Sequence, residues 1–206
     1  MKKRNLFLCT LMSLCTSCGH QEKMVLLGSW SHKSVEMIDA EQDHLLTAFT
    51  SPNMVSNELY KIAETRSIAL ENGKKYSFEK QIRSANSIVI AIGYYDFVPY
   101  LQIDPDQCLF EEDEEQIERQ FSLLAYNVYH TLEEIRSLNA KANIYLLNSY
   151  ISIAFEEPEQ KLFRTFLQKV EQCLLGAMKD HLVQFIPTYL TNQEEEYVKT
   201  FLRYVV

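Results

Sequence analysis

Four side chains near the ends of two apolar runs are of types that could perform ester chemistry. Ser29, Ser31 and His32 follow the first apolar run of the mature sequence, and Asp96 follows the most apolar run, 88–92. A serine hydroxyl, a histidine base and a carboxylate that orients the base are the parts of nucleophilic acyl transfer. Residues adjacent or three apart on a turn seldom hold a nucleophile–base hydrogen bond. A site made from these four side chains would therefore need a rearranged geometry.

The apolar runs that precede these residues predict the strands of a sheet. The run 88–92 is rich in β-branched residues and ends at Gly93, which is typical of a buried parallel strand. Further strands are predicted at 24–27, 54–56, 142–149 and 182–186. Ligands of open α/β sheets bind beyond the carboxyl ends of such strands. We therefore expect any functional site at that edge.

Segments with helical spacing separate the predicted strands. They are 35–49, 59–83 with an interruption at Asn72-Gly73, 117–138, 158–179 and 194–205. The acidic block 111–115 lacks the alternating oxygens and the glycine of a calcium loop, so it is interpreted as part of a solvated helix start. Alternation of strands and helices predicts a three-layer α/β/α domain with a mostly parallel sheet.

Two segments resemble the SGNH (GDSL-type) hydrolases. Gly93-Tyr94-Tyr95-Asp96 is similar to the third block of that family, where a strand ends in Gly-x-Asn-Asp. The segment 132–147, preceded by Tyr126-Asn127, resembles a helix–strand unit of lipoprotein-type members from low-GC Gram-positive bacteria. The resemblance covers residues 24–206. It implies the SGNH-hydrolase (flavodoxin-like) architecture and ester hydrolysis by a serine, a histidine and an aspartate, with a glycine and an asparagine at the oxyanion.

The catalytic positions that this resemblance implies hold other residues. Gly28-Ser29-Trp30-Ser31 occupies the place of Gly-Asp-Ser-Leu, which puts Trp30 at the nucleophile position. Asn57 stands for the second-block glycine, Tyr95 for the oxyanion asparagine, and Pro187 and Leu190 for the aspartate and the histidine. The resemblance thus implies a degenerate cleft without a working triad, lined by Gly28, Trp30, Asn57, Gly93, Tyr95 and Leu190.

The histidines offer no substitute for the missing base. None of the five follows residue 181. His181 precedes the last predicted strand, so we expect it at the amino end of the sheet, opposite the catalytic edge. His130 falls within a predicted amphipathic helix, where we expect it on the surface. His32 is therefore the one histidine expected near the carboxyl edge.

The N-terminus has the pattern of a secretory signal. Lys2, Lys3 and Arg4 precede a short apolar stretch, 6–14, and Cys18 follows small residues. The segment 14–19 resembles a bacterial lipobox, which implies that residues 1–18 act as a signal and that lipidated Cys18 anchors the protein to the membrane on its extracytoplasmic side. Ordinary secretion, with Cys18 unmodified, is the alternative.

Charge and cysteine content exclude several classes of function. Loss of the three N-terminal cations would take the formal net charge from −8 to −11, and such acidity without a basic stripe argues against nucleic-acid binding. Cys108 and Cys173 would be the remaining structural cysteines, too few for a disulfide framework. No set of residues has metal-ligand spacing, so we expect neither a metal nor a cofactor.

Three functions remain open at this level. The first is a non-catalytic protein that binds a glycan or an acyl chain, with aromatic side chains gathered at the old cleft: Trp30, Tyr94, Tyr95, Phe97 and Tyr100. These rings could equally fill the space that catalytic residues vacated. The second is a hydrolase with a rearranged serine among Ser29, Ser31 and Ser34. The third is an interaction protein that uses the acidic block 111–115.

Overall fold

The computed structural model describes residues 22–41, 45–69, 75–104, 109–112, 114–151, 159–187 and 193–205. Its centre is a five-stranded sheet whose order is β2-β1-β5-β8-β9, with every neighbouring pair parallel. The strands are β1 (Lys23–Ser29), β2 (Leu45–Ser51), β5 (Ser87–Ala91), β8 (Asn143–Leu147) and β9 (Val183–Phe185). The predicted strands at 24–27, 88–92, 142–149 and 182–186 are confirmed.

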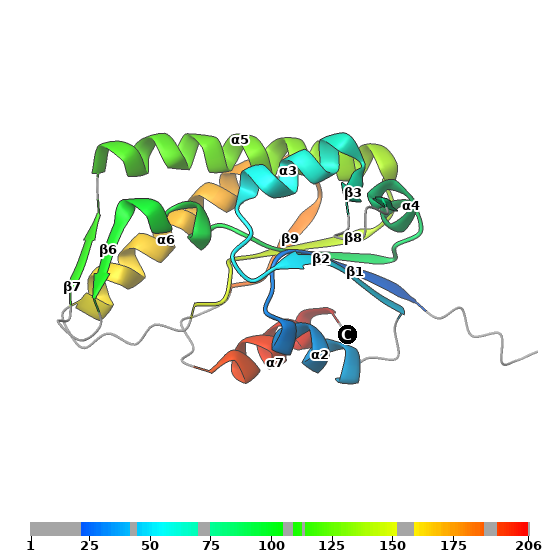
Figure 1. Ribbon diagram of the computed structural model, residues 1–206, viewed down its shortest axis with the longest axis horizontal. Helices are drawn as coiled ribbons and strands as arrows, with labels where there is room; N and C mark the ends of the chain where they lie inside the picture. The colour runs from blue at the N-terminus through cyan, green and yellow to red at the C-terminus, as the bar shows by residue number, and fades with distance from the viewer. Residues whose placement is uncertain are drawn as a thin grey trace, which may run out of the picture.

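Helices cover both faces of this sheet, as Figure 1 shows. On one face lie α2 (His32–Glu41) and α7 (Glu194–Val205), which contact each other. The other face carries α3 (Ser56–Thr65), α4 (Phe78–Arg83), α5 (Glu114–Leu138) and α6 (Glu159–Met178). The three-layer α/β/α prediction is confirmed.

The side chains of β5 point alternately into two separate hydrophobic cores, one on each face of the sheet. Ile88 and Ile90 join the core under α5 and α6, whereas Val89 and Ala91 join the core under α2 and α7. Successive side chains of a strand point to opposite faces, so both faces of a covered strand must be apolar. This requirement explains why all five residues of β5 are buried.

Two short hairpins complete the described chain. One pairs β3 (Ser67–Ala69) with β4 (Lys75–Ser77), and the other pairs β6 (Leu101–Asp104) with β7 (Leu109–Glu112). Between β5 and β6 lie two 3₁₀ turns, η1 (Tyr94–Asp96) and η2 (Val98–Tyr100).

Three predictions for the elements before β5 were wrong. The helix expected over 35–49 ends at Glu41, and its second half is the edge strand β2, which contains no charged residue. The strand expected at 54–56 is instead the approach to α3. The helix expected over 59–83 is divided into α3, the β3–β4 hairpin and α4. The division begins at Arg66, whose left-handed φ of 55° ends α3.

The acidic block 111–115 also differs from its prediction. Its first two residues belong to strand β7, and α5 begins only at Glu114. The helix predicted from 117 is confirmed with an earlier start, and the helices predicted over 158–179 and 194–205 are confirmed as α6 and α7.

The segment 132–147, which resembles the family's helix–strand unit, hydrogen-bonds to the backbone near the amino ends of three strands. The Arg136 guanidinium donates hydrogen bonds to the carbonyls of Ala142 at 2.8 Å, His181 at 2.8 Å and Leu182 at 2.7 Å. The Asn139 amide donates to the carbonyls of Ile82 and Ala85 at 2.8 and 2.9 Å. These carbonyls lie at the end of α4 and in the turns before β5, β8 and β9, so the resembling segment has a structural role here rather than a catalytic one.

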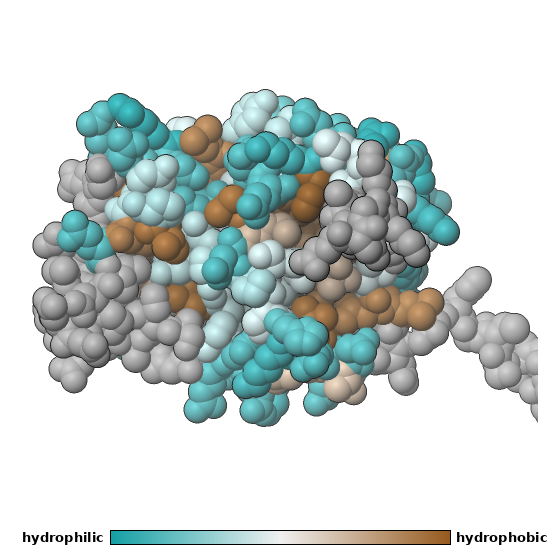
Figure 2. Space-filling view, viewed as in Figure 1, coloured by the Kyte–Doolittle hydropathy of each residue, from teal (hydrophilic) through white to brown (hydrophobic). Residues whose placement is uncertain are grey.

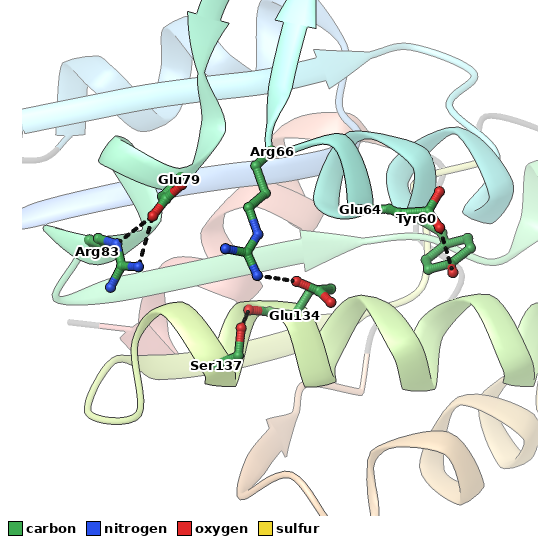
Figure 3. A network of polar contacts seen from close by, with 7 residues as sticks. All are labelled: Tyr60, Glu64, Arg66, Glu79, Arg83, Glu134 and Ser137. Atoms are coloured by element: carbon green, nitrogen blue, oxygen red, sulfur yellow. Dashed lines mark hydrogen bonds and ion pairs between the residues drawn. The ribbon is translucent and has the colours of Figure 1, made fainter.

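The outer helical layer carries a line of polar contacts, drawn in Figure 3. Arg66 at the end of α3 pairs with Glu134 of α5 at 3.0 Å, and Arg83 pairs with Glu79 within α4 at 2.7 Å. Their side chains are between about a third and a half exposed, and exposed ion pairs contribute at most about 1 kcal/mol each. Apolar packing, rather than these pairs, must therefore hold α3 on α5.

The surface view in Figure 2 is mostly polar, with hydrophobic side chains gathered along the β2 edge of the sheet. Leu45 at the start of β2 is 54% exposed there. Of the described helices, none combines the length and the apolar character that crossing a bilayer requires.

Candidate functional site

Trp30, at the position that the resemblance assigns to the nucleophile, belongs to the hydrophobic core. Its side chain is 2% exposed, and its indole N–H donates to the carbonyl of Leu27 at 3.0 Å. The ring packs against Tyr197 and Phe201 of α7, with centroid distances of 5.8 and 5.5 Å. The space beyond β1 is thus filled by an apolar contact between the sheet and α7.

The glycine before this position is required by the backbone. Gly28 has a φ of +91°, and a Cβ on it would lie 2.1 Å from the carbonyl oxygen of Ala91. Only glycine combines that φ with that approach of two strands. The next residue, Ser29, is buried and donates its hydroxyl to the carbonyl of Pro52 at 2.5 Å. The Ser29 hydroxyl is therefore committed to a backbone acceptor.

Ser31 and His32 do not form the pair that a rearranged triad would need. The Ser31 hydroxyl accepts from the amide of Ser34 at 3.0 Å, which makes Ser31 the N-cap of α2. His32 is 90% exposed, and its Nε2 lies 3.3 Å from a carboxylate oxygen of Glu36, one turn along the same helix. The imidazole thus contacts Glu36 at the surface rather than a serine.

A carboxylate from the far end of the chain takes the place of a base beside Ser31. Glu194, the first residue of α7, accepts hydrogen bonds from the hydroxyls of Ser31 and Ser34, the latter at 2.5 Å. Both contacts use Oε1. Ser31 and Glu194 are half-buried, whereas Ser34 is 1% exposed. Glu194 therefore joins the first turns of α2 and α7 at the carboxyl edge of the sheet.

Asp96 is bound to the start of α3 and not to His32. Its carboxylate accepts from the amide of Ser56 at 3.0 and 3.1 Å and from the Ser56 hydroxyl at 2.5 Å. Asn127 of α5 donates its amide to the same hydroxyl at 3.0 Å. Burial raises the pKa of Asp96 to about 6, although its hydrogen bonds with Ser56 act in the opposite direction. The arrangement is a buried helix cap.

Gly93 lies beside a polar residue that follows β8. The φ of Gly93 is +129°, and a Cβ on it would lie 2.9 Å from Val170 and 3.0 Å from Oδ1 of Asn148. Asn148 and Ser149 are 7% and 4% exposed, and neither Asn148 Oδ1 nor Ser149 Oγ has a hydrogen-bond partner. Buried polar groups of this kind are uncommon and often mark a functional site.

Three tyrosines lie at this edge near the start of α7. The pKa of Tyr95 is raised by burial first, and then by the neighbouring Glu194 and Tyr150. Tyr150 packs against Tyr197 with ring centroids 5.4 Å apart, and the Tyr197 hydroxyl donates to the Asn148 carbonyl at 2.8 Å. Tyr95 and Tyr150 are half-buried, whereas Tyr197 is buried. The edge therefore presents two partly exposed rings next to a carboxylate.

The expected aromatic cluster does not form, so that prediction was wrong. Tyr94 and Phe97 are 3% and 0% exposed in the core under α5 and α6, whereas Trp30 lies in the core on the opposite face. Tyr95 and Tyr100 remain half-buried. The large apolar rings fill space in the two hydrophobic cores. This is the alternative that the sequence left open, in which the rings occupy the space that catalytic residues vacated.

The other candidate residues take no part in the cluster around Glu194 or lie beyond the described chain. Asn57 is exposed in the first turn of α3. Cys173 donates its thiol to the Phe121 carbonyl at 3.3 Å, and burial raises its pKa to about 11. Leu190, Cys108 and Cys18 lie outside the described residues, as does the predicted signal 1–18.

The two other histidines among the described residues, His130 and His181, lie away from the carboxyl edge. His181, in the turn before β9, is 8% exposed and packs on Tyr129 with centroids 4.6 Å apart, and burial lowers its pKa. His130 contacts Glu133 at 2.7 Å on α5. No group of three or more His, Cys, Asp or Glu residues is placed to hold a metal ion within the part of the chain that the structure describes.

An open hollow of about 680 Å³ lies between α5 and α6 and is separate from the edge just described. Phe121 and Cys173 line it together with polar side chains of both helices, and it shares no residue with the cluster around Glu194.

Sequence reasoning missed Glu194, Asn148, Ser149 and Tyr150. A usable signal existed for three of them, because Asn148 and Ser149 end the strand predicted at 142–149 and Tyr150 follows it, which places all three at the carboxyl edge. Glu194 gave no comparable signal, since it is 163 residues away from Ser31 in the chain.

Comparisons with known proteins bear on the fold. No protein-family model matches the sequence, and no curated protein matches it. A lipase, Lip_vut3, from a goat rumen metagenome is similar in structure, with a TM-score of 0.60 and 14% identity over 89% of this chain and 97% of the lipase.

Two further solved structures are similar at low sequence identity. Phospholipase A1 from Streptomyces albidoflavus NA297 has a TM-score of 0.54 and 11% identity over 81% of this chain and 79% of that enzyme. A family two carbohydrate esterase from Cellvibrio japonicus has a TM-score of 0.56 and 9% identity over 90% of this chain and 60% of that chain. With its parallel sheet and two helical layers, this chain has the fold of the SGNH/GDSL-type hydrolases.

Proposed function

We propose that this protein is an extracytoplasmic lipoprotein whose hydrolase-like domain binds a ligand at the carboxyl edge of its sheet without hydrolysing it. The observation that carries the proposal is the burial of Trp30 at the position of the nucleophile, with its ring against α7 and its N–H bound to Leu27. Neighbouring hydroxyls do not replace it in a triad, because Ser29 is bound to Pro52 and His32 contacts Glu36.

The energetic argument supports the absence of hydrolysis by the family mechanism. Loss of a whole catalytic triad in a serine protease costs about 10⁶ in kcat. Replacement of the oxyanion asparagine by Tyr95 would remove one donor, and a lost donor costs about 10² to 10³. What remains at this edge is a set of polar side chains and half-buried rings, which suits binding better than acyl transfer.

A fluorophosphonate probe tests the proposal directly. The full chain is incubated with the probe beside an active serine esterase of the same fold, and both are analysed by intact mass. We expect a stoichiometric adduct on the esterase alone. An adduct on this chain that maps to Ser29, Ser31 or Ser34 would overturn the non-catalytic proposal.

The membrane anchor is tested separately. Metabolic labelling with an alkyne-bearing fatty acid is expected to modify the expressed protein and to leave a Cys18→Ala variant unlabelled. Equal labelling of both would contradict lipidation at Cys18, and absence of label from both would favour ordinary secretion.

A second candidate function is favoured by one observation, the hydrogen bond from Ser31 to Glu194. In this alternative the protein is an esterase or acyl hydrolase. The Ser31 oxygen would attack an ester carbonyl while its proton passes to the Glu194 carboxylate, which would later return a proton to the leaving alkoxide. Loss of a measured esterase activity in both Ser31→Ala and Glu194→Gln would support it, and the probe experiment separates it from the first candidate.

A further inference from the structure

We propose that the ligand of the carboxyl edge is a neutral, polyhydroxylated ring, the sugar of a glycan, with Glu194 accepting its hydroxyls and Tyr95 and Tyr150 contacting its apolar face. This inference rests on the proposed binding function and names the chemical class of the ligand. It concerns the residues around Glu194, and Glu194 itself occupies no position that the family resemblance marks.

The carboxylate at this edge is a hydrogen-bond acceptor, so a ligand that binds here should carry hydrogen-bond donors. The Glu194 carboxylate can only accept, and the two serine hydroxyls that it binds both use Oε1, so no hydrogen bond among the described residues occupies Oε2. Asn148 Oδ1, a further acceptor without a partner, is buried beside Gly93 in the segment after β8. A ring bearing several hydroxyl groups supplies the donors that the Glu194 carboxylate requires.

An anionic ligand fits the same groups poorly. A phosphate or a carboxylate would meet the Glu194 charge directly, and the chain as a whole carries a formal net charge of −8. Like charges at contact distance disfavour binding, most strongly where water is excluded. No lysine or arginine contacts Glu194 among the hydrogen bonds and ion pairs of the described residues, so its charge is not neutralised there.

An acyl chain fits poorly for a different reason. A hydrocarbon ligand needs apolar walls, but Trp30, Tyr94 and Phe97 are between 0% and 3% exposed and are used by the two cores. The rings that remain half-buried at the edge are Tyr95 and Tyr150, which carry hydroxyl groups. Tyrosine offers an apolar face together with a polar tip, and both parts match a sugar.

The contacts of Glu194 and Tyr150 indicate that the carboxylate, the amide and the rings lie together. Glu194 contacts Ser31 and Ser34, and its charge acts on Tyr95. Tyr150 lies 5.4 Å from Tyr197, whose hydroxyl binds the Asn148 carbonyl. Carboxylate, amide and rings therefore belong to one cluster, built from the segments that follow β1, β5 and β8 and from the start of α7.

Calorimetric titration tests this proposal with defined sugars. The full chain, reconstituted in phosphatidylcholine nanodiscs, is titrated with cellohexaose, xylohexaose and chitohexaose up to about 10 mM, which suffices to detect millimolar affinity. We expect saturable binding of at least one sugar. Glu194→Gln is expected to weaken that binding about tenfold or more, since a hydrogen bond to a charged group is lost.

Glu196→Gln is the matched control, because Glu196 is an exposed carboxylate in the same first turn of α7. It removes the same charge and should leave the affinity within about twofold, the range expected of a surface change away from the site. Tyr95→Ala is the second test variant and should also weaken binding. Circular dichroism and thermal unfolding of each variant verify that it is folded.

The outcomes separate this inference from the function on which it rests. Absence of binding for all three sugars, or binding that Glu194→Gln and Tyr95→Ala leave unchanged, would overturn the sugar proposal. Saturable binding of sodium octanoate in place of the sugars would assign the edge to an acyl ligand and would also overturn it. The non-catalytic proposal fails only through a fluorophosphonate adduct, which none of these titrations measures.

Discussion

The Asp96 carboxylate holds the first turn of α3 by accepting both the amide and the hydroxyl hydrogen bonds of Ser56. Asp96 lies in the turn after β5, and Ser56 begins the helix that packs on α5. Of the four residues that could have performed ester chemistry, Asp96 thus has a structural task, as Ser29 and Ser31 do. Because burial raises the pKa of Asp96, its protonation should also have a measurable effect on the stability of the protein.

Asp96 should make the stability of the protein depend on pH. Burial raises its pKa from 3.8 in the unfolded chain to about 6, so the folded state binds the proton more tightly. The resulting stabilisation is complete below pH 3.8 and is lost as the pH rises through 6. The loss can reach about 3 kcal/mol, since each unit of pKa difference corresponds to about 1.4 kcal/mol.

Urea unfolding at several pH values between 4 and 7 measures this effect. The free energy of unfolding of the wild type should fall relative to that of Asp96→Asn across this window, because the amide does not titrate. Parallel curves for the two proteins would show that Asp96 is not the group responsible.

Restoring a serine at the nucleophile position should not restore hydrolysis. Trp30→Ser removes a buried ring that contacts Tyr197 and Phe201, so the free energy of unfolding should fall by about 3 to 5 kcal/mol. Of the histidines that the structure describes, none is placed to activate the new hydroxyl, because His32 is exposed beside Glu36 and His130 and His181 lie elsewhere. Turnover of p-nitrophenyl acetate above that of the wild type would contradict the prediction.

Gly28→Ala should destabilise the protein severely. Its Cβ would lie 2.1 Å from the Ala91 carbonyl at a φ of +91°, and such backbone strain alone costs about 1 to 3 kcal/mol before the clash is counted. Gly176→Ala is the matched control, because a Cβ there meets nothing within 4 Å. Gly176 lies inside α6, where alanine should stabilise by about 0.5 to 1 kcal/mol. Thermal unfolding of both variants should therefore give shifts of opposite sign.

Leu182→Gly should stabilise the protein even though it removes a large apolar side chain. Leu182 is 90% exposed, so little burial is lost, and its φ of 53° lies in the left-handed region. Relief of that conformation should be worth about 1 kcal/mol. Its carbonyl still accepts from Arg136 in the variant. A lower midpoint of urea unfolding for Leu182→Gly than for the wild type would contradict this expectation.

The elements that could be predicted from the sequence are those whose burial follows one regular pattern along their whole length. β5 was predictable because helices cover both of its faces, and α5 because its apolar residues face one core at regular spacing. The edge strand β2 was missed because only one neighbour pairs with it, and its seven residues are exposed or half-buried except Phe49. An edge strand of this kind produces no clear alternation of apolar and polar residues in the sequence.

The candidate site was only partly predictable for a related reason. Gly28 and Gly93 were recognised because each closes an apolar run and matches a glycine of the family pattern, and the positive φ of both residues in the structure explains why glycine is needed there. The contact between Ser31 and Glu194 joins segments 163 residues apart and depends on how α7 docks on α2. Spacing along the chain contains no information on such docking, and neither helix alone indicates it.

The position of α7 also affects when the protein can finish folding during its synthesis. The core on the α2 side of the sheet needs Tyr197, Val198 and Phe201, the residues that cover Trp30 and the outward face of β1. A ribosome-bound chain that stops before residue 197 therefore leaves the part of this face that α7 covers open to water, with α2 alone on that side. The polypeptide should not complete this core until α7 has emerged from the ribosome.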